Sequence, residues 1–130
     1  MARILVIDDD KEIRSLLRDI LEPEGYEVAD APNGRVGIKL YEQHPYDLVI
    51  TDMLMPEQEG IETIAELQEK SPTVRIVAMS GGGSRGNFNV LIDAKRFGAT
   101  VTIPKPFGPT EVLAAVRTAL QFPRRAPALG

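Results

Sequence analysis

Short apolar runs alternate with segments of helical periodicity along the chain. Four of these runs are rich in β-branched residues and nearly continuous: residues 4–7, 48–51, 74–79 and 101–103. Continuous apolar runs of this length predict strands that are covered on both faces in a parallel sheet. A fifth run, residues 26–29, alternates apolar and polar positions and therefore predicts an edge strand.

The segments between the runs predict helices. Residues 11–22 carry apolar side chains at the i, i+3, i+4 and i+7 spacing of one helix face, and Pro23 and Gly25 end that helix. The other predicted helices are one N-capped by Asn33 that ends before Pro45, one around Ile61, Ile64 and Ala65, one over residues 88–97, and one after Pro109 that carries Val112, Leu113, Val116 and Leu120.

Strand and helix alternate five times, which predicts an α/β fold with a parallel sheet and right-handed crossovers. At this length we expect the doubly wound, flavodoxin-like (βα)5 arrangement with strand order 2-1-3-4-5. A closed eightfold barrel would need about 250 residues. We expect one domain over residues 1–121, followed by a proline-rich tail or linker stub over residues 122–130.

Composition narrows the chemistry. The chain has 130 residues, no cysteine, one histidine and a formal net charge of −4. These counts exclude disulfides, thiolate metal sites, cysteine nucleophiles and multi-histidine metal sites. The acidic balance argues against direct binding to nucleic acid or to anionic lipid, which need a basic face. No targeting signal or transmembrane-length apolar run is visible, so we expect a cytoplasmic protein without membrane insertion.

Polar side chains stand where the predicted strands end. Three aspartates, residues 8–10, directly follow the first run, and Asp52 follows the run at 48–51. Ser80 follows the run at 74–79, and Lys105 comes shortly after the last one. In doubly wound sheets the carboxyl ends of the strands share one edge, and the functional crevice lies there beside the switch point between strands 1 and 3. We therefore expect these side chains to converge.

Such a cluster suits phosphoryl transfer. Carboxylates from Asp8, Asp9 and Asp52 would repel one another unless a cation bound among them or some stayed protonated. A set of oxygen donors without His or Cys, with room for water and a phosphate oxygen, favours Mg²⁺. With the Ser80 hydroxyl and the Lys105 ammonium beside Asp52, these are the groups needed to transfer a phosphoryl group onto that carboxylate.

Each residue also has a simpler structural interpretation. Asp10 alone could N-cap the first helix, Asp52 and Ser80 could be turn residues, and Lys105 could be a solvated lysine between two prolines. Four unrelated turn residues would have no reason to share these strand ends, and this coincidence favours a site. His44, at the end of the second helix, receives no catalytic role.

Three motifs carry a resemblance to a known family. They are ILVIDDD at residues 4–10, DLVITDMLMP at residues 47–56 and PKPF at residues 104–107. Jointly they resemble the receiver domain of two-component response regulators, of the stand-alone single-domain type, over about residues 3–120. The resemblance implies a signalling domain in a two-component regulatory system or phosphorelay, rather than an enzyme.

The resemblance also implies roles for particular residues. Asp52 would accept a phosphoryl group from a histidine kinase or a histidine phosphotransfer protein. Asp8, Asp9 and Asp52, with the backbone carbonyl of Leu54, would hold Mg²⁺. Ser80 would hydrogen-bond the phosphate and Lys105 would pair with it.

A conformational switch is implied as well. Phosphorylation would draw the Ser80 hydroxyl inward, change the face made by helix 4, strand 5 and helix 5, and alter binding of an unidentified downstream protein. The peptide bond before Pro106 would be cis. Thr102 stands where the family usually carries an aromatic switch residue, so a ring rotamer change is not available. We hypothesise that the glycine-rich loop at residues 81–86 carries more of the response.

Three other interpretations stay open at this point. Residues 81–86 match the G-x-G-x-x-G pattern of nucleotide-binding loops, but on the fourth strand where the fingerprint belongs on the first. Asp8 and Asp10 give the D-x-D spacing of small phosphatases with an Asp nucleophile, although Glu12 stands where Thr or Val is usual. The third is a receiver-like scaffold that is never phosphorylated.

Overall fold

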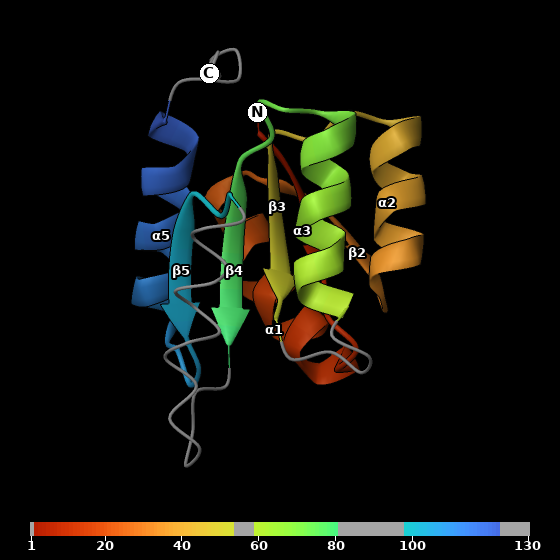
Figure 1. Cartoon of the computed structure of the whole chain (residues 1–130). Helices are drawn as coiled ribbons and strands as arrows, with labels where there is room; N and C mark the ends of the chain where they lie inside the picture. Colours follow the sequence, from red (N-terminus) through yellow and green to blue (C-terminus); the bar gives the residue numbers. More distant parts are fainter. Residues whose placement is uncertain (1, 54–58, 81–97, 123–130) are drawn as a thin grey trace.

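The computed structural model describes residues 2–53, 59–80 and 98–122, with the side chains of residues 59 and 61 left out. Five parallel strands form one sheet in the order β2-β1-β3-β4-β5, which confirms the predicted doubly wound α/β fold (Figure 1). In chain order the elements are β1 (Arg3–Ile7), α1 (Lys11–Leu21), the 3₁₀ turn η1 (Glu22–Glu24), β2 (Glu27–Ala31), α2 (Gly34–Gln43), β3 (Leu48–Asp52), α3 (Glu59–Lys70), β4 (Ile76–Ser80), β5 (Val101–Pro104) and α5 (Pro109–Gln121).

Helices cover both faces of the sheet. Helices α2 and α3 pack on one face, over a core that includes Leu5, Ile7 and Val49. Helices α1 and α5 pack on the other face, over a core that includes Val6 and Ile50. Alternate residues of one strand thus enter opposite cores, which is why β1, β3 and β4 read as continuous apolar runs. No helix in the described ranges is long and apolar enough to cross a membrane.

Side-chain N-caps mark the starts of α1 and α2. The cap of α2 is the one that the sequence predicts. The Asn33 side chain accepts a hydrogen bond from the Val36 amide at 2.9 Å and N-caps α2. The Asp10 side chain accepts from the Glu12 amide at 2.9 Å and N-caps α1. Each cap satisfies one of the amide groups that a first helical turn leaves without a partner. The simple structural role considered for Asp10 is therefore the one it fills.

Several predicted boundaries are wrong by one or two residues. Helix α1 ends at Leu21, because Pro23 belongs to η1, which Gly25 closes with a φ of 95°. Strand β2 covers Glu27–Ala31, where residues 26–29 were predicted. Strand β4 begins at Ile76, because the Val74 amide donates to the Ser71 carbonyl in a turn.

The two edge strands of the sheet are β2 and β5. Strand β2 is an edge strand, as its alternating pattern predicts. Strand β5 forms the other edge, and its residues Val101 and Thr102 are partly buried. The predicted fourth helix, residues 88–97, lies outside the described residues.

Candidate functional site

The end of β1 places two carboxylates at the edge of the sheet. The Asp8 amide donates to the Ala31 carbonyl at 3.1 Å, which extends the pairing of β1 with β2 by one residue. The Asp8 side chain is fully buried and accepts a hydrogen bond from the Asp10 amide at 2.9 Å. Asp9 is the next residue along the chain and is exposed. The two carboxylates therefore differ: one is buried and held, and the other faces solvent.

The third carboxylate comes from β3, the neighbouring strand. Asp52 is the last residue of β3, in register with Met79 of β4, and its exposed fraction is only 4%. Helix α3 packs closely beneath it, because a Cβ added at Gly60 would lie 2.6 Å from Met53 Cα and 2.8 Å from the Asp52 carbonyl oxygen. Only glycine lets the helix approach the backbone at this distance.

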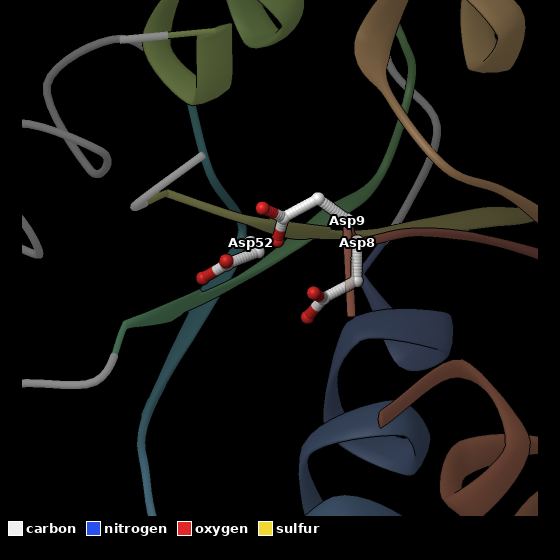
Figure 2. Close-up of side chains that lie close together, drawn as sticks. All are labelled: Asp8, Asp9 and Asp52. Carbon is white, nitrogen blue, oxygen red and sulfur yellow. The ribbon is translucent and has the colours of Figure 1, made fainter. Parts of the chain in front are cut away.

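These side chains converge at the switch point between β1 and β3. Carboxylate oxygens of Asp8, Asp9 and Asp52 all lie within 4.8 Å of one another (Figure 2). Lys105, one residue after β5, brings its Nζ to 3.2 Å from Asp8 Oδ2 and 3.4 Å from Asp52 Oδ1. Lys105 thus brings its ammonium to two of the three carboxylates, so within the described ranges the carboxylates outnumber the ammonium in a partly dehydrated place.

The electrostatics of Asp8 reflect this crowding. Burial raises the pKa of Asp8, and the nearby Asp52 carboxylate raises it further, while the Asp10 amide and the Lys105 ammonium oppose the rise. The protein therefore holds the ionised form of Asp8 at a cost. A cation among the three carboxylates would offset that cost.

Ser80 adds a hydroxyl to the same edge. It is the last residue of β4, is fully buried, and lies in register with Pro104 of β5. Its Oγ has no hydrogen-bond partner in the described part of the chain. A buried hydroxyl without a partner costs about 1 to 3 kcal/mol, which a bound ligand with acceptor oxygens would recover.

The donor set fits a hard divalent cation. All three groups are carboxylates, they are close enough to share one ion, and nothing soft stands among them. Asp9 is exposed, so the ion would keep access to water, as Mg²⁺ requires. Leu54, whose backbone carbonyl was expected to contribute, lies outside the described residues.

The remaining predicted residues have definite places. Thr102 lies in the middle of β5, paired with Ala78 and half-buried. The Lys105–Pro106 peptide bond is cis. His44 caps the C-terminal end of α2 and is exposed, away from the acidic residues. Residues 81–86, the glycine-rich loop, lie outside the described residues, so the nucleotide-binding pattern and the loop hypothesis are not tested.

Sequence reasoning missed three residues at this edge. Gly60 sets the distance between α3 and Asp52, and Arg14 and Asp30 tie the end of β1 to β2 by hydrogen bonds at 2.8 Å. A signal for the last pair was available. Arg14 and Arg18 stand one turn apart on α1, and Asp30 directly follows the alternating run at residues 26–29.

Comparison with known proteins agrees with this geometry. Residues 4–117 match the model of the response regulator receiver domain. The chain belongs to that family. It is 37% identical over 115 residues to "Chemotaxis protein CheY" of Thermotoga maritima, covering 88% of this chain and 93% of that protein. It is 38% identical over 119 residues to the protein of the same name from Bacillus subtilis, covering 91% and 97%.

Solved structures give the same result. A response regulator receiver domain protein from Clostridium thermocellum superposes with a TM-score of 0.82 at 30% identity, covering 92% of this chain and 94% of that one. This receiver domain is accordingly a phosphoacceptor signalling domain, and its family accepts phosphoryl groups from kinases and signals to downstream partners. The D-x-D phosphatase interpretation has no support in the geometry, because Asp10 caps α1 and Asp8 is fully buried.

Proposed function

We propose that Asp52 is the phosphoacceptor of this receiver domain and that it takes its phosphoryl group from a histidine kinase or a histidine phosphotransfer protein. The observation that carries the proposal is the meeting of three carboxylates, the Lys105 ammonium and an unpartnered buried Ser80 hydroxyl at one edge of the sheet, all among the described residues. We further propose that the domain covers residues 1–121, since α5 ends at Gln121, with residues 122–130 as a tail or linker stub.

The transfer needs no general base. The Asp52 carboxylate attacks the donor phosphorus directly, so an O–P bond forms as the N–P bond of the phosphohistidine breaks and the imidazole leaves. Lys105 pairs with the incoming phosphoryl oxygens, which separates its ammonium from the carboxylates it now faces at 3.2 and 3.4 Å. The Ser80 hydroxyl donates to a phosphoryl oxygen and so gains the partner it lacks among the described residues.

Asp8, Asp9 and Asp52 would hold Mg²⁺, together with the Leu54 carbonyl. When bound, the ion would neutralise charge that builds up on the phosphoryl oxygens and would reduce the repulsion between the three carboxylates. The chain's own contribution is to bring the carboxylates together from two strands before any ligand arrives.

Phosphorylation then changes partner binding. The Ser80 hydroxyl stands at the end of β4 beside β5, so its movement toward phosphate is coupled to Thr102 and to the face that β5 and α5 help to form. Thr102 replaces a swinging ring with a small polar side chain. An unidentified downstream protein would read this face, with coupling of about 1 to 3 kcal/mol between phosphate and partner.

Incubation with phosphoramidate and Mg²⁺, followed by intact mass measurement, tests the acceptor. The wild type should gain one phosphoryl group, and Asp52→Asn should gain none. Asp19→Asn, which removes an exposed carboxylate of α1, is the matched control and should react like the wild type. Lys105→Met should react more slowly than Lys39→Met, which removes an exposed ammonium from α2.

Two results would contradict the proposal. A mass gain that persists in Asp52→Asn would move the acceptor to another residue. A wild type that never gains mass from a small phosphodonor or from any phosphorylated histidine protein would support the scaffold interpretation instead.

A further inference from the structure

The guanidinium of Arg14 joins two strands at the edge of the acidic site. Its Nη1 donates to the Asp8 carbonyl oxygen at 2.8 Å, and its Nε donates to Asp30 Oδ2 at 2.8 Å. The side chain is only 15% exposed. A planar guanidinium with donors in a fixed fork can hold a carbonyl on one side and a carboxylate on the other, and it loses little freedom in doing so.

The carbonyl that Arg14 holds belongs to the peptide unit between Asp8 and Asp9. Because a peptide unit is planar, the direction of its carbonyl also sets the direction of the Asp9 amide and the position of Asp9 Cα. The Asp8 amide is fixed from the other side by the Ala31 carbonyl. Two neighbouring residues of β2, Asp30 and Ala31, therefore control both ends of Asp8, one directly and one through Arg14.

Asp9 depends on this arrangement more than Asp8 does. The Asp8 carboxylate is held by the Asp10 amide and by Lys105. The Asp9 carboxylate is exposed, and no hydrogen bond to it occurs among the described residues. Its place within 4.8 Å of the other two carboxylates thus rests on the backbone that carries it.

We propose that Arg14 is a positioning residue of the cation site: braced by Asp30, it orients the Asp8–Asp9 peptide so that the Asp9 carboxylate faces Asp8 and Asp52. The inference rests on the proposed function, because it assumes that the three carboxylates bind a divalent cation. Groups that brace metal ligands from behind typically contribute on the order of 10-fold to 100-fold in metal affinity.

The sign of the effect separates positioning from charge. Arg14 is a cation near a cation site, so electrostatics alone predicts that its removal would strengthen divalent cation binding. Positioning predicts the opposite. A weaker site after loss of a nearby positive charge cannot be a charge effect.

Arg18 supplies a matched control on the same helix. Its Nη2 donates to the other oxygen of Asp30 at 2.8 Å, and its Nη1 donates to Glu22 and to the Val28 carbonyl, whereas the Asp8 carbonyl is held by Arg14. Arg14→Met and Arg18→Met each remove one guanidinium from Asp30 and keep an unbranched apolar stem. They differ in the contact with the Asp8 carbonyl.

Isothermal titration of Mn²⁺ and Mg²⁺ alone into the full chain, without a phosphodonor, measures the effect. Arg14→Met should weaken cation binding by about tenfold, and Arg18→Met should stay within about twofold of the wild type. Arg14→Lys, which keeps the charge and lacks the fork, should also weaken binding and serves if Arg14→Met does not fold. In the cation-free protein, amide chemical shifts of Asp9 and Asp10 should move in the Arg14 variants and stay in place in Arg18→Met.

The outcomes separate this inference from the proposed function. If Arg14→Met and Arg14→Lys bind the cation as tightly as the wild type or more tightly, Arg14 does not position the site. Equal losses in Arg14→Met and Arg18→Met would show a general effect of breaking the Asp30 ion pairs, and would also overturn the inference. If the wild type binds neither cation, the metal site of the proposed function fails first.

Discussion

The middle of the sheet and its carboxyl edge are built from the same strands and obey opposite rules. In the middle, Leu5, Val49 and Ile50 are fully buried apolar side chains. One residue beyond the end of β1, and at the last residues of β3 and β4, the buried side chains are Asp8, Asp52 and Ser80. The middle contributes folding free energy through apolar burial, whereas the edge spends part of it to hold like charges and a buried hydroxyl together.

The difference shows what each region can do. A rigid apolar centre fixes the strand ends, so carboxylates from separate strands can be held close without a ligand. A site that is crowded before binding gains more from a cation or a phosphoryl group than a relaxed one would. Stability and binding should therefore respond separately to changes in the two regions.

The largest expected effect is a loss of stability without a loss of site chemistry. Leu5→Ala removes a fully buried side chain from the centre of β1 and should lower the free energy of unfolding by about 2 to 5 kcal/mol. Urea denaturation measures the loss. In the folded protein, Mg²⁺ affinity by titration calorimetry should stay within about twofold of the wild type. A tenfold weaker cation site would show that the two regions are not separable.

A smaller change at the junction of the two regions should affect both properties. Gly60→Ala places a methyl group against the backbone of Asp52 and Met53, and such overpacking costs about 1 to 3 kcal/mol, partly offset by the higher helix propensity of alanine. Because the displaced atoms are backbone atoms of the proposed acceptor and its neighbour, phosphorylation by phosphoramidate should slow as well. Intact mass measured over time gives the rate.

Gly37→Ala is the matched control for that change. Gly37 is also a glycine in a helix that packs on the sheet, but the atoms nearest an added Cβ are side-chain atoms of Ile7 rather than backbone atoms. Some stability should be lost, and the phosphorylation rate per folded molecule should remain near that of the wild type. If both variants slow the reaction equally, general loosening of the fold is responsible rather than the position of Asp52.

The sequence alone predicted the order of the strands in the sheet and the residues at their carboxyl ends. Alternation of strands and helices predicted the sheet order, and the rule that parallel strands share one carboxyl edge brought Asp8, Asp52, Ser80 and Lys105 together. The predicted start of β4 was wrong because an apolar side chain such as Val74 is buried equally well in a turn. The hydrophobic pattern does not distinguish a buried turn residue from the first residue of a strand.

Contacts across the fold could not be predicted in the same way. The approach of Gly60 to the Asp52 backbone depends on the distance between a helix and a strand, and glycine also occurs near helix starts where no backbone packs against it. The link from Arg14 to Asp30 depends on which oxygen or carbonyl a long side chain reaches. Both are consequences of the three-dimensional packing and leave only weak traces in one sequence.

The smallest expected change in stability comes from Asp8 at the edge of the sheet, and it has the opposite sign to the change expected in the middle. Asp8→Asn replaces a buried carboxyl group whose charged form is disfavoured, so it should stabilise the protein near neutral pH when no divalent cation is present, whereas truncation of Leu5 destabilises it. Burial and the Asp52 carboxylate raise the pKa of Asp8, against the opposing influence of the Asp10 amide and Lys105. Asp9 also lies within reach of this group and adds to the negative charge.

The pH dependence follows from the raised pKa. Between the ordinary carboxyl pKa, about 3.9, and the higher pKa in the native state, the folded protein holds the proton that the unfolded chain has released. The free energy of unfolding therefore falls as pH rises through this window, and Asp8 contributes stability only below it. In Asp8→Asn this fall should disappear, so the difference in melting temperature between variant and wild type should grow from acid toward neutral pH.

Added Mg²⁺ should reverse the order of the two melting temperatures, because it stabilises the ionised wild-type site and finds one carboxylate fewer in the variant. A variant that melts below the wild type at neutral pH without a divalent cation would show that the Asp8 carboxylate stabilises the fold through Lys105 and the Asp10 amide.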